Sequence, residues 1–437
     1  MSMTSMNGWN NSIFVVGGGA AGMMAAITAA ENGAQVTLLE RNDRLGKKLY
    51  ITGKGRCNEP NGKLGKKLFI TGKGRCNVTN NCTSDEVLKN VPVNPRFLYS
   101  ALSGFSPADA MAFFEAHGCK LKTERGNRVF PESDQAGSVI DALRRFLKET
   151  GVKIEWERAL EITAKNGAVT GVRTQTGVLP ADKVILATGG CSYPATGSTG
   201  DGYEMAARLG HTIIEPRGSL VPLVEKGHTC AAMQGLALKN VNVKLLDAKG
   251  KCVFEEFGEL LFTHFGLSGP VILSASCHMQ RGKDGYRVVI DLKPALDEKT
   301  LDARLLRDFA EFQNKDLANA LVKLLPHSMI VPAIQKAGLS SQQKVNELTK
   351  AERRALLETL KQFPIDIASC APVEQAIVTS GGVKVSEVSP KTMESKLVKG
   401  LYFAGELLDV DAYTGGFNLQ IAWATGRLAG SASAQEG

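Results

Sequence analysis

The sequence lacks the features by which several classes of protein are recognised. Its 437 residues contain no apolar run of about 18 residues, so no membrane span is expected. The polar start, Met1–Asn11, has neither the charged nor the apolar region of a signal peptide. The nine cysteines are scattered, odd in number and without a Cys-x-x-Cys pair, which argues against a disulfide framework or a zinc site. We therefore expect a cytoplasmic protein with reduced thiols and no metal.

Composition and charge narrow the class further. With 43% hydrophobic and 22% charged residues the chain has a globular composition, and its length suggests two or three domains. Glycine is over-represented, at 46 residues. The net charge of +8 would permit a nucleic-acid partner, but residues 45–63 alone contribute half of it. We therefore expect a small-molecule substrate rather than nucleic acid, and the sequence leaves the oligomeric state open.

That basic segment is one copy of a tandem repeat. Leu45–Asn58 reads LGKKLYITGKGRCN and Leu64–Asn77 reads LGKKLFITGKGRCN, so the period is 19 residues (45–63 and 64–82) and only Tyr50/Phe69 differs. Two copies do not make a solenoid, which needs about three or more units. A recent duplication or an assembly artefact is the simpler interpretation, and a functional doubled loop is the alternative.

The N-terminal region predicts a strand, a glycine turn, a helix and a second strand. Ile13–Val16 and Gln35–Leu39 are strand-like, and the intervening helix extends to about Glu31. Its start reads GGGAAG (Gly17–Gly22), in which glycines let the backbone touch a pyrophosphate at the helix N-terminus. Glu40 lies 18 residues past Gly22, where a carboxylate accepts hydrogen bonds from ribose hydroxyls. The pattern favours a bound adenine dinucleotide over a glycine-rich turn without a ligand.

Two later junctions between a strand and glycines indicate which dinucleotide binds. No second Gly-x-Gly-x-x-Gly is present, but Val184–Gly190 and Leu401–Glu406 each run from an apolar strand into glycine. Either one alone is equally well an ordinary strand ending in a turn. Together with the N-terminal pattern they favour FAD, because a late strand of FAD proteins returns to the flavin. NAD(P)H would then bind transiently as an electron donor.

The repeated segment adds cations next to glycines. Lys66–Arg75 interleaves lysine and arginine with glycine, which suits a pyrophosphate, although a solvated basic loop has the same composition. Cys76 is expected to be a packing cysteine rather than a redox thiol, because it has no Cys-x-x-Cys partner.

Three further positions are candidates for site residues. Asn418 is predicted as the N-cap of the last helix, either as a cap alone or as a cap whose helix also contacts the flavin. Tyr193 lies in a glycine-rich loop that is either a substrate-side loop or a connection. His264 is either a proton donor beside the flavin or, as we favour, a structural histidine. The catalytic group is therefore not identified, with Tyr193 and His264 as candidates.

The remaining pattern predicts an α/β protein whose nucleotide domain is split by inserts. Val152–Trp156, Leu160–Thr163, Val169–Thr174 and Lys183–Ala187 suggest an antiparallel meander. Short strands follow up to about residue 296, then helical periodicity up to Pro364, and a closing helix over Leu419–Gly430. We expect an FAD-binding domain of residues 1–209 and 371–437, a β-rich substrate-side domain of 210–297 and about 364–370, and a helical insert of 298–363.

The motifs together resemble the BaiN-like family of bacterial NAD(P)/FAD-dependent oxidoreductases. They are GGGAAG (Gly17–Gly22), LGKKLFITGKGRCNVTN (Leu64–Asn80), ATGG (Ala187–Gly190), FTHFGLSGP (Phe262–Pro270), TSGGV (Thr379–Val383), FAGELLD (Phe403–Asp409) and GGFNLQ (Gly415–Gln420). The resemblance covers essentially the whole chain. It implies a Rossmann-like, two-dinucleotide-binding-domain flavoprotein fold with a β-barrel insert and a helical insert, binding FAD noncovalently.

The resemblance also implies roles for individual residues. Glu40 would hold ribose, residues 74–77 would line the flavin, and a C-terminal group would hold the ribityl chain and isoalloxazine. The full set of expected cofactor contacts is Gly17, Gly19, Ala20, Ala21, Gly22, Glu40, Arg41, Lys67, Gly74, Arg75, Cys76, Asn77, Thr188, Gly189, Gly405, Glu406, Asp409, Asn418 and Leu419. We favour the second copy of the repeat because only it continues into Val78-Thr79-Asn80; otherwise Gly55, Arg56, Cys57 and Asn58 take its place.

The expected activity is that of an FAD-dependent oxidoreductase passing a hydride between flavin N5 and a small organic substrate. NAD(P)H-driven reduction of an activated C=C bond is the first choice, and an O₂-dependent amine or amino-ketone oxidase is the second. A non-enzymatic flavin-binding protein, RNA-associated or regulatory, is a third.

Overall fold

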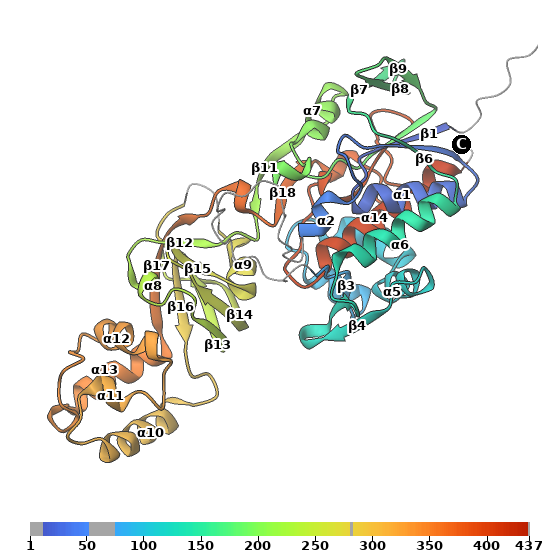
Figure 1. Ribbon diagram of the computed structural model, residues 1–437. Helices are drawn as coiled ribbons and strands as arrows, with labels where there is room; N and C mark the ends of the chain where they lie inside the picture. The colour runs from blue at the N-terminus through green and yellow to red at the C-terminus, as the bar shows by residue number, and fades with distance from the viewer. Residues whose placement is uncertain (1–11, 52–74, 280–282, 436–437) are drawn as a thin grey trace, which may run out of the picture. The chain divides into compact units, whose positions relative to one another are not determined.

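The computed structural model describes residues 12–51, 75–279 and 283–435. It divides into two compact units (Figure 1). The dinucleotide unit comprises Met1–Ser219 and Val373–Gly437, and the barrel unit comprises Leu220–Pro372. This division starts the insert at Leu220 rather than at residue 210, because β11 (Ile213–Ser219) pairs antiparallel with β18 (Val378–Val383) inside the dinucleotide unit. It also keeps the helical segment, 298–363, in one unit with the barrel.

A five-stranded parallel sheet organises the dinucleotide unit and confirms the predicted α/β class. Its order is β19 (Leu401–Phe403), β10 (Lys183–Leu186), β1 (Ser12–Val16), β2 (Gln35–Leu39) and β6 (Lys153–Glu155). The predicted meander is wrong for two of its members, since β6 and β10 belong to this sheet. Val184, Ile185 and Leu186 are all fully buried, as in a parallel strand covered on both faces.

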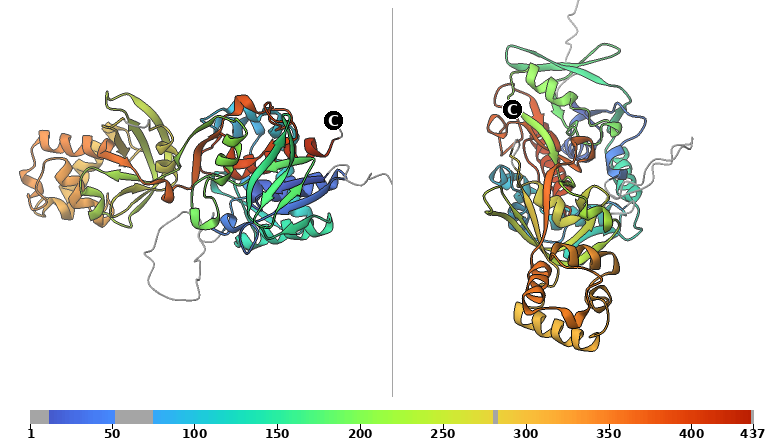
Figure 2. Two further views of the ribbon diagram at one scale, coloured as in Figure 1. Left: turned by 90° about the horizontal axis from the view of Figure 1, so that it is seen from above. Right: turned by 90° about the vertical axis from the view of Figure 1, so that its left-hand side faces the viewer.

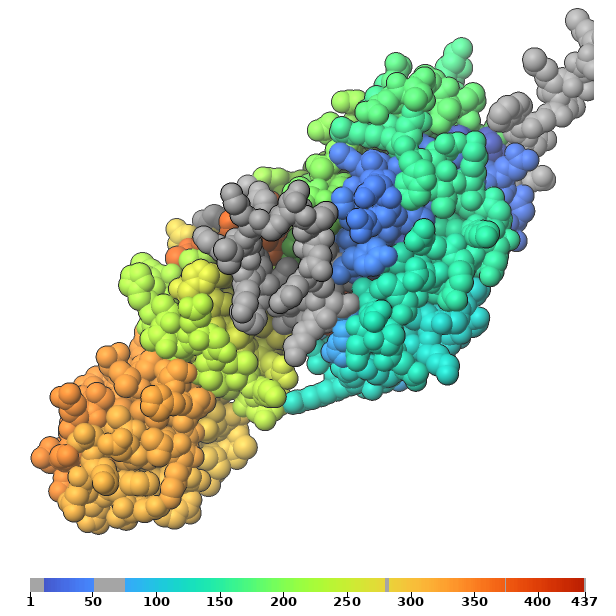
Figure 3. All heavy atoms as spheres, in the orientation of Figure 1, coloured from blue at the N-terminus to red at the C-terminus, as the bar shows by residue number. Residues whose placement is uncertain are grey.

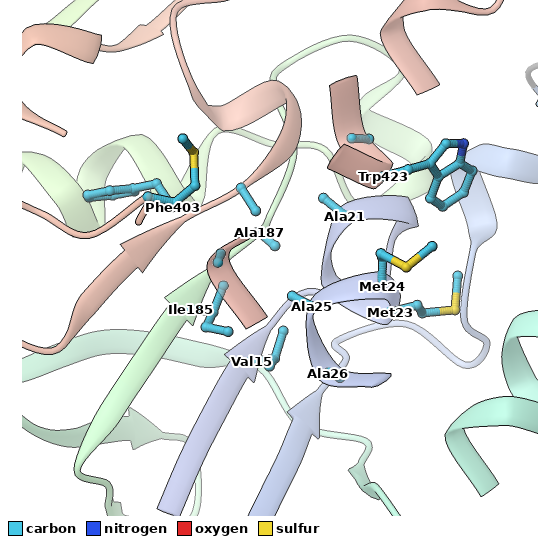
Figure 4. Close-up of a cluster of buried hydrophobic side chains, with 14 of the residues drawn as sticks. Val15, Ala21, Met23, Met24, Ala25, Ala26, Ile185, Ala187, Phe403 and Trp423 are labelled. Carbon is cyan, nitrogen blue, oxygen red and sulfur yellow. The ribbon is translucent and has the colours of Figure 1, made fainter. Parts of the chain in front are cut away.

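Two helices pack closely beside this sheet. α1 (Ala20–Glu31) lies against α14 (Phe417–Ala434), and Figure 4 shows alanines and methionines of α1 near Trp423 of α14. The close approach needs glycine, because a Cβ on Gly426 would lie 2.4 Å from the carbonyl oxygen of Ala21. The buried Trp423 indole donates a hydrogen bond of 2.9 Å to the carbonyl of Val78. The C-terminal helix therefore fixes both the glycine-turn helix and the end of the repeat.

The smaller elements of the dinucleotide unit complete its core. The antiparallel meander consists of β7 (Ala159–Lys165), β8 (Ala168–Thr174) and β9 (Val178–Pro180). A second small sheet consists of β3 (Thr79–Asn80), β5 (Arg128–Pro131) and β4 (Leu121–Glu124). The helices are α2 (Lys47–Ile51), α3 (Ser84–Lys89), α4 (Tyr99–Gly104), α5 (Pro107–Ala116), α6 (Ala136–Glu149) and α7 (Asp201–Arg208). Across the described ranges, no helix of the chain is long and apolar enough to cross a membrane.

The barrel unit is a closed barrel with helices at its side. The strand order is β12 (Leu223–Glu225), β15 (Gly266–Ser268), β14 (Cys252–Phe262), β13 (Ala237–Leu246), β16 (Arg287–Asp291) and β17 (Phe363–Cys370). The helices are α8 (Thr229–Ala232), α9 (Pro270–Ser276), α10 (Glu298–Glu311), α11 (Leu317–Ala320), α12 (His327–Lys336) and α13 (Lys350–Lys361). α12 and α13 pack against β17. The orange helical segment lies beside the barrel strands in the ribbon (Figure 2) and touches the barrel in the space-filling view (Figure 3). The predicted barrel insert is confirmed.

Candidate functional site

The carboxyl ends of four neighbouring parallel strands bring together the main predicted cofactor positions. β1 ends before Gly17, β2 before Glu40, β10 before the Ala187–Gly190 junction, and β19 before Gly405. Because the strands are parallel and adjacent, these ends lie at one edge of the sheet, where open α/β sheets bind ligands. Segments distant in the chain thus converge on a single edge.

In the glycine turn after β1, Gly17, Gly18 and Gly22 are tightly packed and Gly19 is open. Gly17 has φ +109°, and a Cβ there would lie 2.6 Å from the carbonyl oxygen of Ala187. A Cβ on Gly22 would lie 1.8 Å from the carbonyl oxygen of Gly17. Gly19 caps α1 without a side-chain hydrogen bond, and its Cβ direction is open for 4 Å. The N–H groups of Ala20 and Ala21, in the first turn, have no partner within the helix, and the open position at Gly19 beside them suits a pyrophosphate.

Glu40 is a fixed, buried carboxylate at the end of β2. It is 5% exposed, and its Oε2 accepts a 2.8 Å hydrogen bond from the Gly18 amide. Its Oε1 accepts from the backbone and side-chain nitrogens of Asn42, at 2.7 and 2.6 Å. The neighbouring Arg41 instead reaches Asp201, at 2.9 Å. Glu40 is thus placed at the turn, and Arg41 is tied to the start of α7.

The ends of β10 and β19 bring an unsatisfied hydroxyl and two glycines to the same edge. The Thr188 Oγ1 atom is buried and has no hydrogen-bond partner. Gly189 and Gly405 have φ of +75° and +74°, which favours glycine. The Gly405 amide donates to Thr425 Oγ1 at 3.0 Å, and a Cβ on Gly405 would lie 2.7 Å from that of Ala21. The β19 end therefore approaches the first turn of α1 closely.

A polar cluster that the motifs did not identify joins Lys48 to this region. Lys48 Nζ donates to Glu406 Oε2 at 2.6 Å and to Ser192 Oγ at 2.7 Å. Glu406 Oε1 also accepts from the Thr379 amide at 2.7 Å. Glu406 was predicted, whereas Lys48 belongs to the first copy of the repeat and was passed over in favour of Lys67. The signal was present in the sequence, since the two copies are identical at this position.

Of the second copy, the structure describes the residues from Arg75 onward. Lys67 and Gly74 lie outside the described residues, as do the alternatives Gly55, Arg56, Cys57 and Asn58. Arg75 Nη1 donates to Glu124 at 2.6 Å and to Asp134 at 3.0 Å, and these carboxylates raise the pKa of the guanidinium. Cys76 is fully buried, and Asn77 Oδ1 is buried without a partner.

The prediction that Asn418 caps the last helix is wrong. The N-cap of α14 is Gly416, with φ +100°, and no side chain caps it. Asn418 instead accepts from the Ala412 amide at 2.9 Å and donates to the Ala412 carbonyl at 2.7 Å, so it closes the preceding loop. The half-buried Leu419 packs on the core. Burial raises the pKa of Asp409, whose carboxylate accepts from Asn94 at 3.0 Å.

The two catalytic candidates lie in different units. Tyr193, in the dinucleotide unit, has a left-handed backbone (φ 52°) that is uncommon for a tyrosine. Its hydroxyl is buried without a partner, and burial raises its pKa to about 12. His264 is exposed in the barrel unit and packs edge-on against Phe265. Strained backbone and an unsatisfied polar atom distinguish Tyr193.

The residues at the strand ends fit FAD. The open face at Gly19, the uncapped helix α1 and the buried carboxylate of Glu40 suit the diphosphate and the adenosine ribose. Thr188 Oγ1 and Asn77 Oδ1 are buried without a hydrogen-bond partner among the described residues, and Thr188 Oγ1 lies against Gly202 of α7.

Comparison with known proteins supports the same conclusion. A family model described as "HI0933-like protein Rossmann domain" matches residues 11–62 and 59–432. The 3-dehydro-bile acid delta(4,6)-reductase of Clostridium scindens is 33% identical over 97% of this chain and 99% of that protein. The ribosomal RNA dihydrouridine synthase of Escherichia coli is 30% identical over 94% of this chain and 95% of that protein.

Among solved structures, 3-ketosteroid delta1-dehydrogenase from Sterolibacterium denitrificans covers 97% of this chain and 100% of that chain, with a TM-score of 0.49 and 14% identity. The family resemblance expected from the motifs is confirmed by the family model and the two relatives, which span nearly the whole chain. The chain is therefore an FAD-dependent oxidoreductase that belongs to the HI0933-like family.

Proposed function

We propose that the protein reduces a C=C bond activated by a neighbouring carbonyl group, with NAD(P)H as the electron donor. One observation carries this proposal: two relatives that each match more than nine-tenths of the chain are named for saturating a C=C bond. One is a delta(4,6)-reductase and the other a dihydrouridine synthase. Their substrates differ greatly in size, so the shared element is the reaction class rather than the molecule.

The chemistry needs a hydride for one carbon and a proton for the other. FAD held at the strand ends would supply that hydride once NAD(P)H has reduced it. Tyr193 is our candidate for the proton, because its hydroxyl has no hydrogen-bond partner within the described part of the chain and its backbone is held in an uncommon conformation. Burial raises the pKa of this hydroxyl to about 12, so it is protonated at neutral pH. The Tyr193 loop follows Ser192, which is itself bound to Lys48 and Glu406. The polar cluster thus anchors the loop that carries the donor.

A uracil base in RNA is the second candidate substrate. The ribosomal RNA dihydrouridine synthases support it, since the enzymes from Escherichia coli and Haemophilus influenzae are 30% and 28% identical to the chain. A small conjugated ketone remains our first choice, because the bile-acid reductase matches at higher identity over a larger share of the chain.

Anaerobic spectroscopy separates the two candidates. NADPH or NADH should bleach the flavin absorbance at about 450 nm in the purified protein. A conjugated keto-steroid should then restore the absorbance and gain two hydrogen atoms, as read by mass spectrometry. Restoration by uridine-containing ribosomal RNA, and not by the keto-steroid, would instead support the second candidate. Failure of both cofactors to bleach the flavin would refute the choice of electron donor.

A further inference from the structure

The two copies of the repeat contribute different halves to the described structure. From the first copy the structure describes Leu45–Ile51, and from the second copy Arg75–Asn77. These two pieces do not duplicate one another. In the 14-residue motif, the first supplies positions 1–7 and the second supplies positions 12–14.

The first-copy half is built into the dinucleotide unit. The Gly46 amide donates to the Gly18 carbonyl at 2.8 Å, which ties the motif to the glycine turn. Leu45 and Leu49 are 2% and 3% exposed. Gly46 has φ +65° and its Cβ position lies 3.1 Å from Ile140 of α6, so any other residue would be strained and crowded there. This half also carries Lys48, which binds Glu406 and Ser192.

The second-copy half is anchored just as firmly. Arg75 binds Glu124 and Asp134 and lies 4.2 Å from the centre of the Phe130 ring. Cys76 is fully buried. The chain continues directly into Val78, whose amide donates to the Val129 carbonyl at 2.8 Å. Each half therefore has its own contacts within one folded unit.

The distance along the chain explains which copy occupies each place. The motif start must follow Glu40, and four residues separate Glu40 from Leu45, against 23 from Leu64. The motif end must precede Val78, which directly follows Asn77, whereas 19 residues separate Asn58 from Val78. Because the two copies have the same sequence, they can make the same contacts. The copy joined by the shorter connecting chain is therefore favoured, since placing it costs less chain entropy.

The length of the intervening chain agrees with this assignment. Between Ile51 and Arg75 lie 23 residues, whereas in an undivided copy only four, Thr71 to Gly74, separate Ile70 from Arg75. The excess is one 19-residue period of the repeat.

We propose that the dinucleotide unit takes the start of the motif from the first copy, Leu45–Ile51, and its end from the second, Arg75–Asn77, so that the sequence carries one period more than the motif needs. In this arrangement Lys48, and not Lys67, is the positioning residue that holds Glu406 and Ser192 at the ends of β19 and β10. The proposal rests on the FAD site but not on the reaction that FAD performs there.

The repeat provides a matched pair of variants. Lys48→Met should weaken FAD binding by about tenfold, whereas Lys67→Met should bind FAD like the wild type. Titration of apoprotein with FAD, followed by flavin absorbance, measures both without any turnover, so the result is independent of the proposed reductase activity. Lys48→Arg should restore most of the affinity. Equal losses in both variants, a loss only in Lys67→Met, or no loss in either would overturn the role of Lys48.

The Glu406→Gln variant controls for the possibility that Lys48→Met weakens FAD binding only by destabilising the fold. In that background Lys48→Met should have little further effect, because the carboxylate it positions is already gone. A tenfold loss that persists there would show that Lys48 acts otherwise.

Deletion of residues 52–70 tests the surplus period directly. It joins Ile51 to Thr71 and leaves one intact motif, LGKKLYITGKGRCN, with the start of the first copy and the end of the second. The shortened protein should bind FAD within about twofold of the wild type and keep its circular dichroism spectrum. A protein that fails to fold, or that folds but loses FAD, would show that the second period is required.

Discussion

The two units differ in how they treat their buried polar groups. In the dinucleotide unit, Asn77, Thr188, Tyr193 and Asp411 each bury an oxygen that has no hydrogen-bond partner. In the described part of the barrel unit no side chain does so. Such an atom costs about 1–3 kcal/mol. The dinucleotide unit therefore carries buried polar groups that its own described side chains and backbone leave without a partner.

The barrel unit instead satisfies its buried charges internally. Glu225, 8% exposed, accepts hydrogen bonds from the amides of Thr229 and Cys230, at 3.1 and 2.7 Å. Asp308, 4% exposed, pairs with Arg304 at 2.7 Å. The barrel unit thus pairs these buried carboxylates with groups of its own. If this contrast is correct, variants in the dinucleotide unit should mainly affect ligand binding, and variants in the barrel unit should mainly affect stability.

The largest separation is expected at glycines. Gly19→Val adds a side chain into open space, so the apoprotein should melt like the wild type while FAD affinity falls about a hundredfold or more. Gly269→Ala is the matched variant in the barrel unit. Gly269 has φ +98° and a Cβ position 2.9 Å from Leu260, so this change should lower stability and leave FAD affinity intact. FAD titration and thermal melting of both variants measure the effects, and FAD binding by Gly19→Val at wild-type affinity would refute the site.

The catalytic candidates provide the next comparison. Tyr193→Phe removes the buried hydroxyl and should lower kcat by about 10²–10⁴-fold, with FAD content unchanged. His264→Asn, in the barrel unit, should lower kcat far less. Steady-state reduction of a conjugated ketone by both variants is the measurement. If His264→Asn abolishes turnover while Tyr193→Phe does not, the proton donor lies in the barrel unit.

Ligand linkage provides a third test. FAD at about a thousandfold excess over its Kd should stabilise the unit that binds it by about 4 kcal/mol. Hydrogen exchange followed by mass spectrometry should therefore show slower exchange in β1, α1 and α14, and little change in β13, β14 and α10. Uniform slowing in both units would show that they open together rather than separately.

The sequence predicted the positions of the candidate site only in part. The glycine turn, Glu40 and the junctions after β10 and β19 were predictable, because they depend on local backbone geometry that recurs along the chain. Lys48 was passed over, because the sequence was interpreted with one whole copy of the motif at the site, whereas Leu45 and Gly46 of the first copy are packed there. Asn418 was misassigned, because a side chain suited to capping was used instead to close a loop at Ala412. The contacts of Asn418 depend on tertiary packing, which local patterns do not encode, whereas the place of Lys48 follows from its distance along the chain from Glu40.

The fourth test concerns pH and the buried Asp411. Burial raises the pKa of Asp411 above its ordinary value of 3.8, although Ser219 donates to it at 2.6 Å. The folded state thus binds this proton more tightly than the unfolded state. The resulting stability is fully present below about pH 4 and is lost as the pH rises through the raised pKa.

Asp411→Asn cannot titrate, so it should flatten that part of the pH dependence. Asp409, whose pKa burial also raises, gives a slope of the same sign that remains in the variant. Chemical unfolding of the dinucleotide unit across the acidic range, with and without the substitution, measures the difference. A variant with the full wild-type slope would assign the effect to other groups.

The smallest effect is expected for the exposed ion pairs of the barrel unit. Arg354 bonds Glu298 at 2.8 Å and Glu358 at 2.7 Å, but its side chain is 54% exposed and both carboxylates are more than half exposed. Solvent and salt screen such pairs, so Arg354→Ala should change the free energy of unfolding by less than about 1 kcal/mol, and high salt should remove the difference. Lys361→Met is the useful contrast, because Lys361 and Asp291 are only 15% and 20% exposed. Its loss leaves a largely buried carboxylate without its cation and should cost more. Chemical unfolding measures the loss in free energy of unfolding for both variants. Equal losses would show that buried ion pairs stabilise the barrel unit no more than exposed ones, which would contradict the proposed role of its buried pairs.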